Sequence, residues 1–251
     1  LMKIANWNIL HGLKIPHGIY DQEIFCQDLT TFKDIDLLCV QEVDLQQPRT
    51  NLDDQLSLIS STLNLSYSIF APALSGTPGE SFTDKIVPGP QFGVGIASRI
   101  PFTSTETIAL KPAPFGAPLF IPKQGWIYIK DEPRVALAMH FSQFTLITTH
   151  LSFIPGFNIH QLRQIQKWAR TFPNPTLLTG DLNLPPRILN RVTKWNSLIS
   201  LQTYPSWGPK MQLDYLLSRE ESWKINDTKR IKMQTSDHFA IQGEIEIPES
   251  A

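Results

Sequence analysis

The sequence contains few cysteines and no long apolar run. Its only cysteines are Cys26, in a predicted helix, and Cys39, in a predicted buried strand, which excludes a disulfide framework and favours two free thiols in a reducing cytoplasm. No stretch approaches the roughly 18 apolar residues of a membrane span. The opening segment LMKIANWNIL lacks the basic region and cleavage site of a signal peptide. We therefore expect a cytoplasmic protein, while secretion stays open if a signal once preceded this sequence.

A surplus of basic residues is also absent. Lys and Arg number 22 against 23 Asp and Glu, and the densest basic cluster is KRIK at 229–232. A protein that tracks a nucleic-acid backbone over many contacts usually carries a basic stripe. The balance argues against a processive nuclease but excludes no small phosphorylated substrate.

Length and composition predict one catalytic domain over residues 1–251, because no internal repeat, charge block or linker divides the chain. We expect it to be a monomer. At 41% apolar residues, the sequence has enough hydrophobic side chains for a sizeable core.

Short apolar runs predict more strands than helices. Strands are expected at 2–8, 35–41, 66–70, 93–98, 103–109, 126–130, 134–141, 144–150, 176–180, 213–217, 223–232 and 238–247. Helices are expected at 21–33, 53–64 and 158–171, with Asp53 or Asn51 capping the second and Asn158 the third. The close spacing of 134–141 and 144–150 indicates a hairpin. The pattern favours an α/β fold of two packed mixed sheets with helices outside.

Two segments fit neither strand nor helix. Residues 71–92 and 111–125 are dense in proline and glycine, so we expect long loops there. The second also carries apolar side chains at 115–121. It either folds back onto the sheets or forms a rim that faces the substrate.

Polar side chains stand where the apolar runs end. They are Asn8, Glu42, His150, Asp181, Asn183, Asp214, Asp237 and His238. Strands that end in this way deliver their side chains to a common edge, where an α/β enzyme places its chemistry. Carboxylate and amide oxygens suit Mg²⁺, for which Mn²⁺ can substitute. Zinc is disfavoured because the sequence has no Cys-x-x-Cys, His-x-His or HExxH motif.

The neighbours of these residues form six motifs, NWNILHG, QEVD, TTHLSF, GDLNLP, QLDYLL and SDHFAI. In this order the motifs resemble those of the endonuclease/exonuclease/phosphatase superfamily, which includes deoxyribonucleases, abasic-site endonucleases, inositol polyphosphate 5-phosphatases and neutral sphingomyelinases. They run from residue 6 to residue 241. The resemblance implies a four-layer α/β/β/α sandwich and Mg²⁺-dependent hydrolysis of a phosphodiester or phosphomonoester by in-line attack of water.

The metal-binding residues follow from this resemblance. It implies that Glu42 is the principal ligand and that Asp237 is a second carboxylate on the metal side. Asn8 would orient metal or phosphate, although asparagine also ends many strands as a turn former. Asp237 and His238 can act together only if they lie in the loop that enters the last strand, because neighbours within a strand face opposite ways.

The resemblance also implies the catalytic residues. Asp181 would position and deprotonate the water, and Asn183 would hold phosphate or metal; both share one face if the backbone there is extended. His150 and His238 would stabilise charge at the phosphate, with Asp214 as the partner of His238. Their division of roles stays open.

Substrate identity is the least determined property. Arg134 and Arg49 are candidates for phosphate contacts, since guanidinium groups bind phosphate bidentately, but salt bridges or exposed charges are equally compatible. Trp207 could stack on a base or sugar, or pack within its loop. Abasic-site endonucleases typically carry an Asp where this chain has Leu10. We expect a small or lipid-like substrate, with DNA or RNA cleavage as the alternative and a non-catalytic phospholigand-binding module as a further one.

Overall fold

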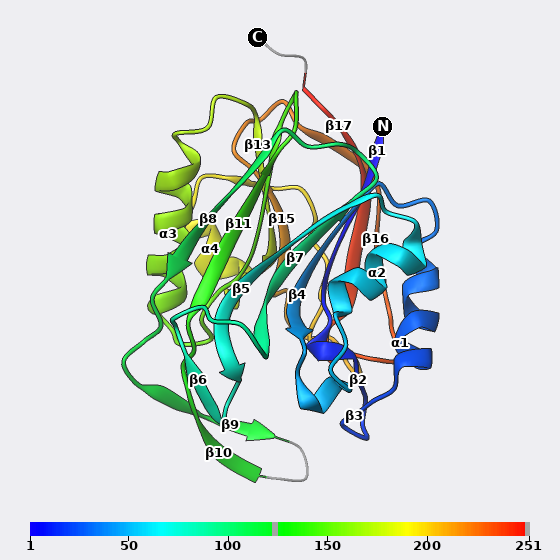
Figure 1. Cartoon of the computed structure of the whole chain (residues 1–251). Helices are drawn as coiled ribbons and strands as arrows, with labels where there is room; N and C mark the ends of the chain where they lie inside the picture. The colour runs from blue at the N-terminus through cyan, green and yellow to red at the C-terminus, as the bar shows by residue number, and fades with distance from the viewer. Residues whose placement is uncertain (122–124, 249–251) are drawn as a thin grey trace.

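Two mixed β-sheets pack face to face at the centre of the protein (Figure 1). The computed structural model describes residues 1–121 and 125–248. The first sheet has the order β16 (Lys224–Ile231), β17 (Ala240–Glu246), β1 (Met2–Asn8), β4 (Leu37–Leu45), β7 (Gln91–Ser98), β5 (Tyr67–Thr77) and β6 (Ser81–Thr83). The second has the order β14 (Asn196–Ser197), β15 (Asp214–Ser218), β13 (Thr176–Asp181), β12 (Thr145–His150), β11 (Arg134–His140) and β8 (Ser104–Leu110).

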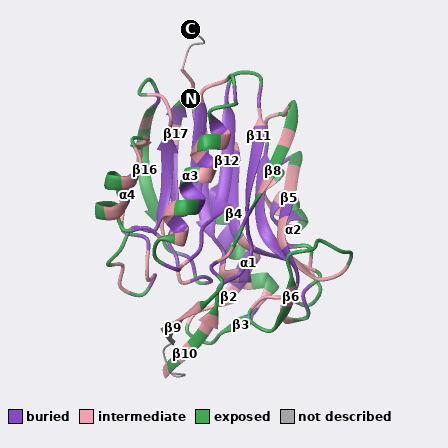
Figure 2. Ribbon diagram, turned by 90° about the vertical axis from the view of Figure 1, so that its left-hand side faces the viewer, coloured by how far each residue is buried: buried purple, intermediate pink, exposed green. Residues whose placement is uncertain are grey.

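Helices cover the outer face of each sheet. The elements α1 (Gln22–Leu29) and α2 (Gln55–Leu63) lie against the first sheet, and α3 (Phe157–Ala169) and α4 (Pro186–Val192) lie against the second. Three hydrophobic clusters separate the layers: one lies between the sheets, one under α1 and α2, and one under α3 and α4. The central strands of both sheets are buried, whereas β16, most of β8 and the outer faces of the helices are exposed (Figure 2). The predicted four-layer sandwich is therefore confirmed.

Two short hairpins extend the fold at one end. They are β2 (Leu13–Lys14) with β3 (Ile19–Tyr20), and β9 (Gly116–Ile121) with β10 (Gly125–Lys130). Both lie at the lower end of Figure 1, and the two termini lie at the opposite end. The hairpin of β11 and β12 was predicted and is present. Within the described residues, no helix is long and apolar enough to cross a membrane.

The prediction of long loops at 71–92 and 111–125 is only partly right, because residues 84–90 and 111–115 lie outside helices and strands but much of the rest forms strands. The first segment contains the end of β5, all of β6 and the start of β7, and the second contains β9; residues 122–124 lie outside the described part. In the first segment, Pro72 lies at an irregular position of the sheet, where proline is tolerated, and most of the other prolines and glycines lie in the turns between strands. The register between β5 and β7 shifts at Pro72, and a Cβ on Gly93 would lie 2.0 Å from the carbonyl oxygen of Ala71.

The helix starts differ from the predicted ones. Asp54, rather than Asp53 or Asn51, caps α2 by accepting from Ser57 N at 3.0 Å. Asn158 lies inside α3 instead of capping it, and its amide nitrogen donates to the carbonyl of Asn183 at 2.9 Å. The helix α4, which follows Pro185, was not predicted. Asn158 thus ties the third helix to the GDLN segment.

Candidate active site

Strand register brings the polar ends of the second sheet together. His150 pairs with Asp181 across β12 and β13, and Asp181 pairs with Asp214 across β13 and β15. The first sheet contributes Asn8 from the end of β1, Glu42 from β4, and Asp237 and His238 from the loop before β17. That loop position was the condition for Asp237 and His238 to act together. All eight predicted metal-binding and catalytic residues therefore come from this edge of the two sheets.

Glu42 lies on an irregularity of β4. The register between β4 and β7 shifts between Gln41 and Val43, and Glu42 has φ +57°. A bulge of this kind aims a side chain out of the sheet. The carboxylate lies 3.7 Å from His11 Nδ1. Burial raises the pKa of Glu42, but the adjacent His11 side chain and the hydrogen bond from Asn8 lower it more, so the pKa lies well below its ordinary value.

Asn8 links the two sheets through its amide nitrogen. This nitrogen donates to Glu42 Oε1 at 3.0 Å and to Asp181 Oδ2 at 3.1 Å. The amide oxygen accepts from Leu10 N at 3.1 Å, which determines the orientation of the group. Asn8 therefore holds two carboxylates in place, while its role as a metal ligand stays a prediction.

The donor set fits Mg²⁺ better than a metal enclosed by protein. Among the residues that the structure describes, no group of three or more His, Cys, Asp or Glu side chains is placed to hold a metal ion. Mg²⁺ commonly binds through one or two carboxylates, with water and phosphate completing its shell. Glu42 is ionised at neutral pH because its pKa is lowered, and its side chain keeps 19% exposure toward the site. Asp237 is a second oxygen donor on the same edge.

Asp181 lies at the centre of the site. Its Oδ2 is 3.1 Å from Asn8 Nδ2, 3.5 Å from His150 Nε2 and 3.6 Å from His238 Nε2. Burial raises the pKa of Asp181 to about 7, against the lowering effect of the His238 charge. A carboxylate with a pKa near neutrality, bordered by two histidines, is suited to accept a proton from water.

His238 is held by a buried carboxylate. Its Nδ1 lies 2.8 Å from Asp214 Oδ2, and Asp214 is completely buried. Burial lowers the pKa of His238, but the charges of Asp214 and Asp181 raise it well above the ordinary value. The ring is therefore cationic at neutral pH. The ring of Tyr204 packs beside it, with centroids 4.9 Å apart.

His150 has the opposite electrostatic surroundings. Arg134 Nη1 lies 3.0 Å from its Nδ1, and both side chains are buried. Burial and the Arg134 charge lower the pKa of His150 well below the ordinary value. The site thus combines one neutral and one cationic histidine on two sides of Asp181.

Asn183 reaches the site from a left-handed backbone. Its φ is +49°, so the condition of an extended backbone, under which Asp181 and Asn183 would share one face, is not met. Its N–H donates to Asp181 Oδ1 at 2.9 Å, and its amide nitrogen donates to the Leu151 carbonyl at 3.0 Å. The turn, rather than strand alternation, brings Asn183 beside Asp181 and His150.

Three further residues were predicted as candidates for contacts with the substrate, and two of them already contact other side chains. Arg49 forms a bidentate ion pair with Asp44, both distances being 2.8 Å. Arg134 is only 6% exposed and contacts His150. Trp207 is 55% exposed, so it is not a packed loop aromatic. The phosphate roles of both arginines stay predictions.

Sequence reasoning missed three residues of the site. His11 contacts Glu42, Tyr204 packs on His238, and Glu132 is a buried carboxylate whose pKa is raised by burial although Arg134 lowers it. His11 belongs to the motif NWNILHG, and its distance of three residues from Asn8 was an available signal. Tyr204 and Glu132 carried no comparable signal, because both come close to the site only through loop packing.

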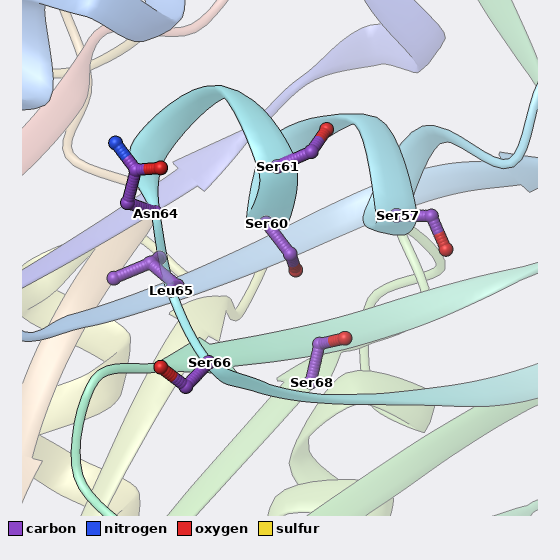
Figure 3. A pocket seen from close by; sticks show the side chains of 7 residues that line it. All are labelled: Ser57, Ser60, Ser61, Asn64, Leu65, Ser66 and Ser68. Carbon is purple, nitrogen blue, oxygen red and sulfur yellow. The ribbon is translucent and has the colours of Figure 1, made fainter.

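A separate hollow of about 470 Å³ lies beside α2 and the start of β5 (Figure 3). It is lined by Ser57, Ser60, Ser61, Asn64, Leu65, Ser66 and Ser68. The start of β5 pairs with the end of β7, which in turn pairs with the start of β4, so the hollow lies at the end of the sheet away from Glu42. Its lining has no titratable group, and we place no reaction there.

Comparisons with known proteins identify the family and the fold. The model of the "Endonuclease/Exonuclease/phosphatase family" matches residues 5–238. A protein with that family description from Beutenbergia cavernae superposes with a TM-score of 0.67 at 17% identity, covering 98% of this chain and 72% of the other. The fold is shared by the mannosyl-6-phosphatase Bt3783 of Bacteroides thetaiotaomicron, with a TM-score of 0.63 at 15% identity, covering 98% of this chain and 100% of the other. It is also shared by the catalytic domain of human nocturnin, with a TM-score of 0.63 at 17% identity, covering 98% of this chain and 94% of the other. No curated protein matches the sequence.

Proposed function

Because this chain belongs to the endonuclease/exonuclease/phosphatase family, we propose that it is a metal-dependent hydrolase that cleaves a phosphoester bond by in-line attack of water. The observation that carries the proposal is the position of Asp181, whose Oδ2 lies within 3.6 Å of both His150 Nε2 and His238 Nε2. This arrangement places a proton acceptor between one neutral donor and one cationic donor. Such a set suits the transfer of a phosphoryl group to water.

Mg²⁺, or Mn²⁺ in its place, would be held by Glu42 with Asp237 and Asn8 nearby, and would supply neutralising charge to the phosphate. Asp181 accepts the proton of the attacking water, and Asn183 orients that water or the phosphate. His238, kept cationic by Asp214, stabilises the charge that develops on the phosphate oxygens. His150 donates a hydrogen bond on the leaving-group side. No covalent intermediate is needed.

Turnover of a generic diester tests the reaction class. We expect hydrolysis of bis-p-nitrophenyl phosphate that requires Mg²⁺ and is lost in Asp181→Asn. A comparison with p-nitrophenyl phosphate distinguishes diester from monoester cleavage. Binding of phosphorylated compounds without any metal-dependent turnover would instead support a non-catalytic ligand-binding module.

For the substrate, we propose a small or lipid-like phosphoester. The hairpin β9–β10 lies at the end of the molecule that holds the site and exposes Trp126 (72%) and Tyr128 (67%), and Phe115 beside it is 51% exposed. A net charge of −1 gives little attraction for a long polyanion. The structural similarity to a mannosyl-6-phosphatase is compatible with a small substrate. We also propose that the enzyme is a monomer and, on the basis of its two free thiols, that it is cytoplasmic.

Nucleic-acid cleavage is the second candidate, because the description of the matching family includes endonucleases and exonucleases. The deciding experiment is a panel of plasmid and single-stranded DNA, RNA, phosphoinositides, sphingomyelin and nucleotides, each with Mg²⁺ at roughly physiological salt. We expect weak, non-processive action on DNA at best. Efficient plasmid degradation with a steep dependence on salt would overturn the small-substrate proposal.

A further inference from the structure

The His150 ring lies between two hydrogen-bond donors. Arg134 Nη1 is 3.0 Å from its Nδ1, and the amide nitrogen of Asn183 is 3.2 Å from its Nε2. A guanidinium has donors only, and a neutral imidazole accepts at one nitrogen only. A ring that accepted at both nitrogens would have lost both protons, a form that histidine does not adopt near neutral pH. At most one of the two contacts is therefore a hydrogen bond, and the other ring nitrogen carries the proton.

The contact with Arg134 is the stronger of the two. Arg134 is permanently charged and 6% exposed, and its bond to the ring is shorter and charge-assisted. The amide nitrogen of Asn183 already donates to the Leu151 carbonyl at 3.0 Å, so it is satisfied without the ring. The guanidinium of Arg134 has no acceptor to offer, so the ring nitrogen that faces it must be the acceptor. The amide group of Asn183 does not impose this on Nε2, because it already donates to the Leu151 carbonyl. Nδ1 of His150 therefore accepts from Arg134.

We propose that Arg134 is a positioning residue that holds His150 as a neutral imidazole with its proton on Nε2. Nε2 is the nitrogen that faces Asp181, whose Oδ2 is 3.5 Å away. The two histidines of the site are thus held by groups of opposite charge, because Asp214 accepts from Nδ1 of His238. What the Nε2 proton does rests on the proposed function: it donates to an oxygen of the phosphoester without adding positive charge.

The buried Arg134 side chain has few other hydrogen bonds that could account for its position. Its Nε is buried and has no hydrogen-bond partner among the described residues, whereas its Nη1 lies 3.0 Å from His150 Nδ1. Nδ1 of His150 also lies 4.0 Å from Glu42 Oε1, which is beyond hydrogen-bond distance, so Arg134 is the hydrogen-bond partner of this nitrogen. Arg134 then acts on the substrate through the ring.

The test is a ¹⁵N NMR spectrum of histidine-labelled protein at neutral pH, with and without Mg²⁺. We expect His150, assigned by its absence in His150→Gln, to show an unprotonated Nδ1 and a protonated Nε2. In Arg134→Met the signals should move toward a mixture of tautomers, while those of His238 stay unchanged as an internal control. Arg134→Lys should keep more of the wild-type signature, since an ammonium also only donates.

Kinetics give the second readout. Arg134→Met should lower kcat on bis-p-nitrophenyl phosphate by about 10- to 100-fold, the range for groups that orient a functional histidine, with Arg134→Lys losing less. Arg99→Met, which removes an arginine paired with Asp36 away from the site, should change neither spectrum nor rate. A wild-type His150 protonated on Nδ1, or ring signals unaffected in Arg134→Met, would overturn the proposal. If no phosphoester is hydrolysed but the spectra are as expected, the positioning stands and the proposed activity fails.

Discussion

Asp214 and His238 should behave as one functional unit. The 2.8 Å contact between them joins a cationic ring to a fully buried carboxylate. A hydrogen bond to a charged group contributes about 1.5–3 kcal/mol, and each 1.36 kcal/mol corresponds to roughly a tenfold change in rate. Asp214→Asn should therefore lower kcat by about 10- to 150-fold if this bond is needed in the transition state. His238→Ala should lower it by about 10²-fold or more, the range for a group that donates a proton or stabilises charge.

The double variant separates coupling from two independent effects. Once His238 is absent, Asp214 has no ring to hold, so adding Asp214→Asn should change kcat by less than about threefold. Stability gives an independent readout. His238→Ala leaves a buried carboxylate without its partner, which is strongly destabilising, and Asp214→Asn should restore part of the lost free energy of unfolding.

The assay is steady-state hydrolysis of bis-p-nitrophenyl phosphate with saturating Mg²⁺, accompanied by thermal unfolding of each variant. Asp36→Asn is the control. This carboxylate accepts from Lys3 N at 2.9 Å just before β4 begins, far from the end that carries Glu42, so kcat should not change. Losses that multiply in the double variant would refute the coupled pair.

Three further outcomes are expected. Glu42→Gln should remove most Mg²⁺-dependent activity while the fold is kept, since an amide binds the ion more weakly than a carboxylate; activity at an unchanged Mg²⁺ dependence would argue against Glu42 as a ligand. Asp181→Asn should abolish turnover yet raise Tm above pH 7. The pKa of Asp181 in the folded protein, about 7, lies above the ordinary 3.8, so the stability contributed by the neutral carboxyl group is complete below pH 3.8 and is lost as the pH rises through 7. An amide does not ionise and therefore avoids this loss. An unchanged or lower Tm at pH 8 would contradict this. The raised pKa of His238 predicts that kcat falls on the alkaline side, and Asp214→Asn should move that fall to lower pH, as read from the pH profile.

The sequence alone predicted the two-sheet sandwich and which polar residues lie together at one edge of it. Both predictions depend on the order of residues within short segments. An apolar strand that ends in one polar residue places that residue at a sheet edge, wherever the strand packs. The strand β12 ends in this way at His150, and β13 ends in this way at Asp181. The extra strands within 71–92 could not be predicted, because Pro72 is tolerated in β5 only at its irregular pairing with β7, which the sequence does not reveal.

Protonation and orientation within the site were decided by the tertiary structure. The sequence left the roles of His150 and His238 open because each ring is set by a distant neighbour. Arg134, 16 residues from His150, makes one ring a neutral donor, and Asp214, 24 residues from His238, makes the other a cation. Likewise, Asn8 meets Asp181 across 173 residues, and the N–H of Leu10 determines which end of its amide faces the carboxylates. Residue types and their order along the chain are local properties, whereas charge state depends on burial and on the nearest charges, which exist only once the two sheets have packed.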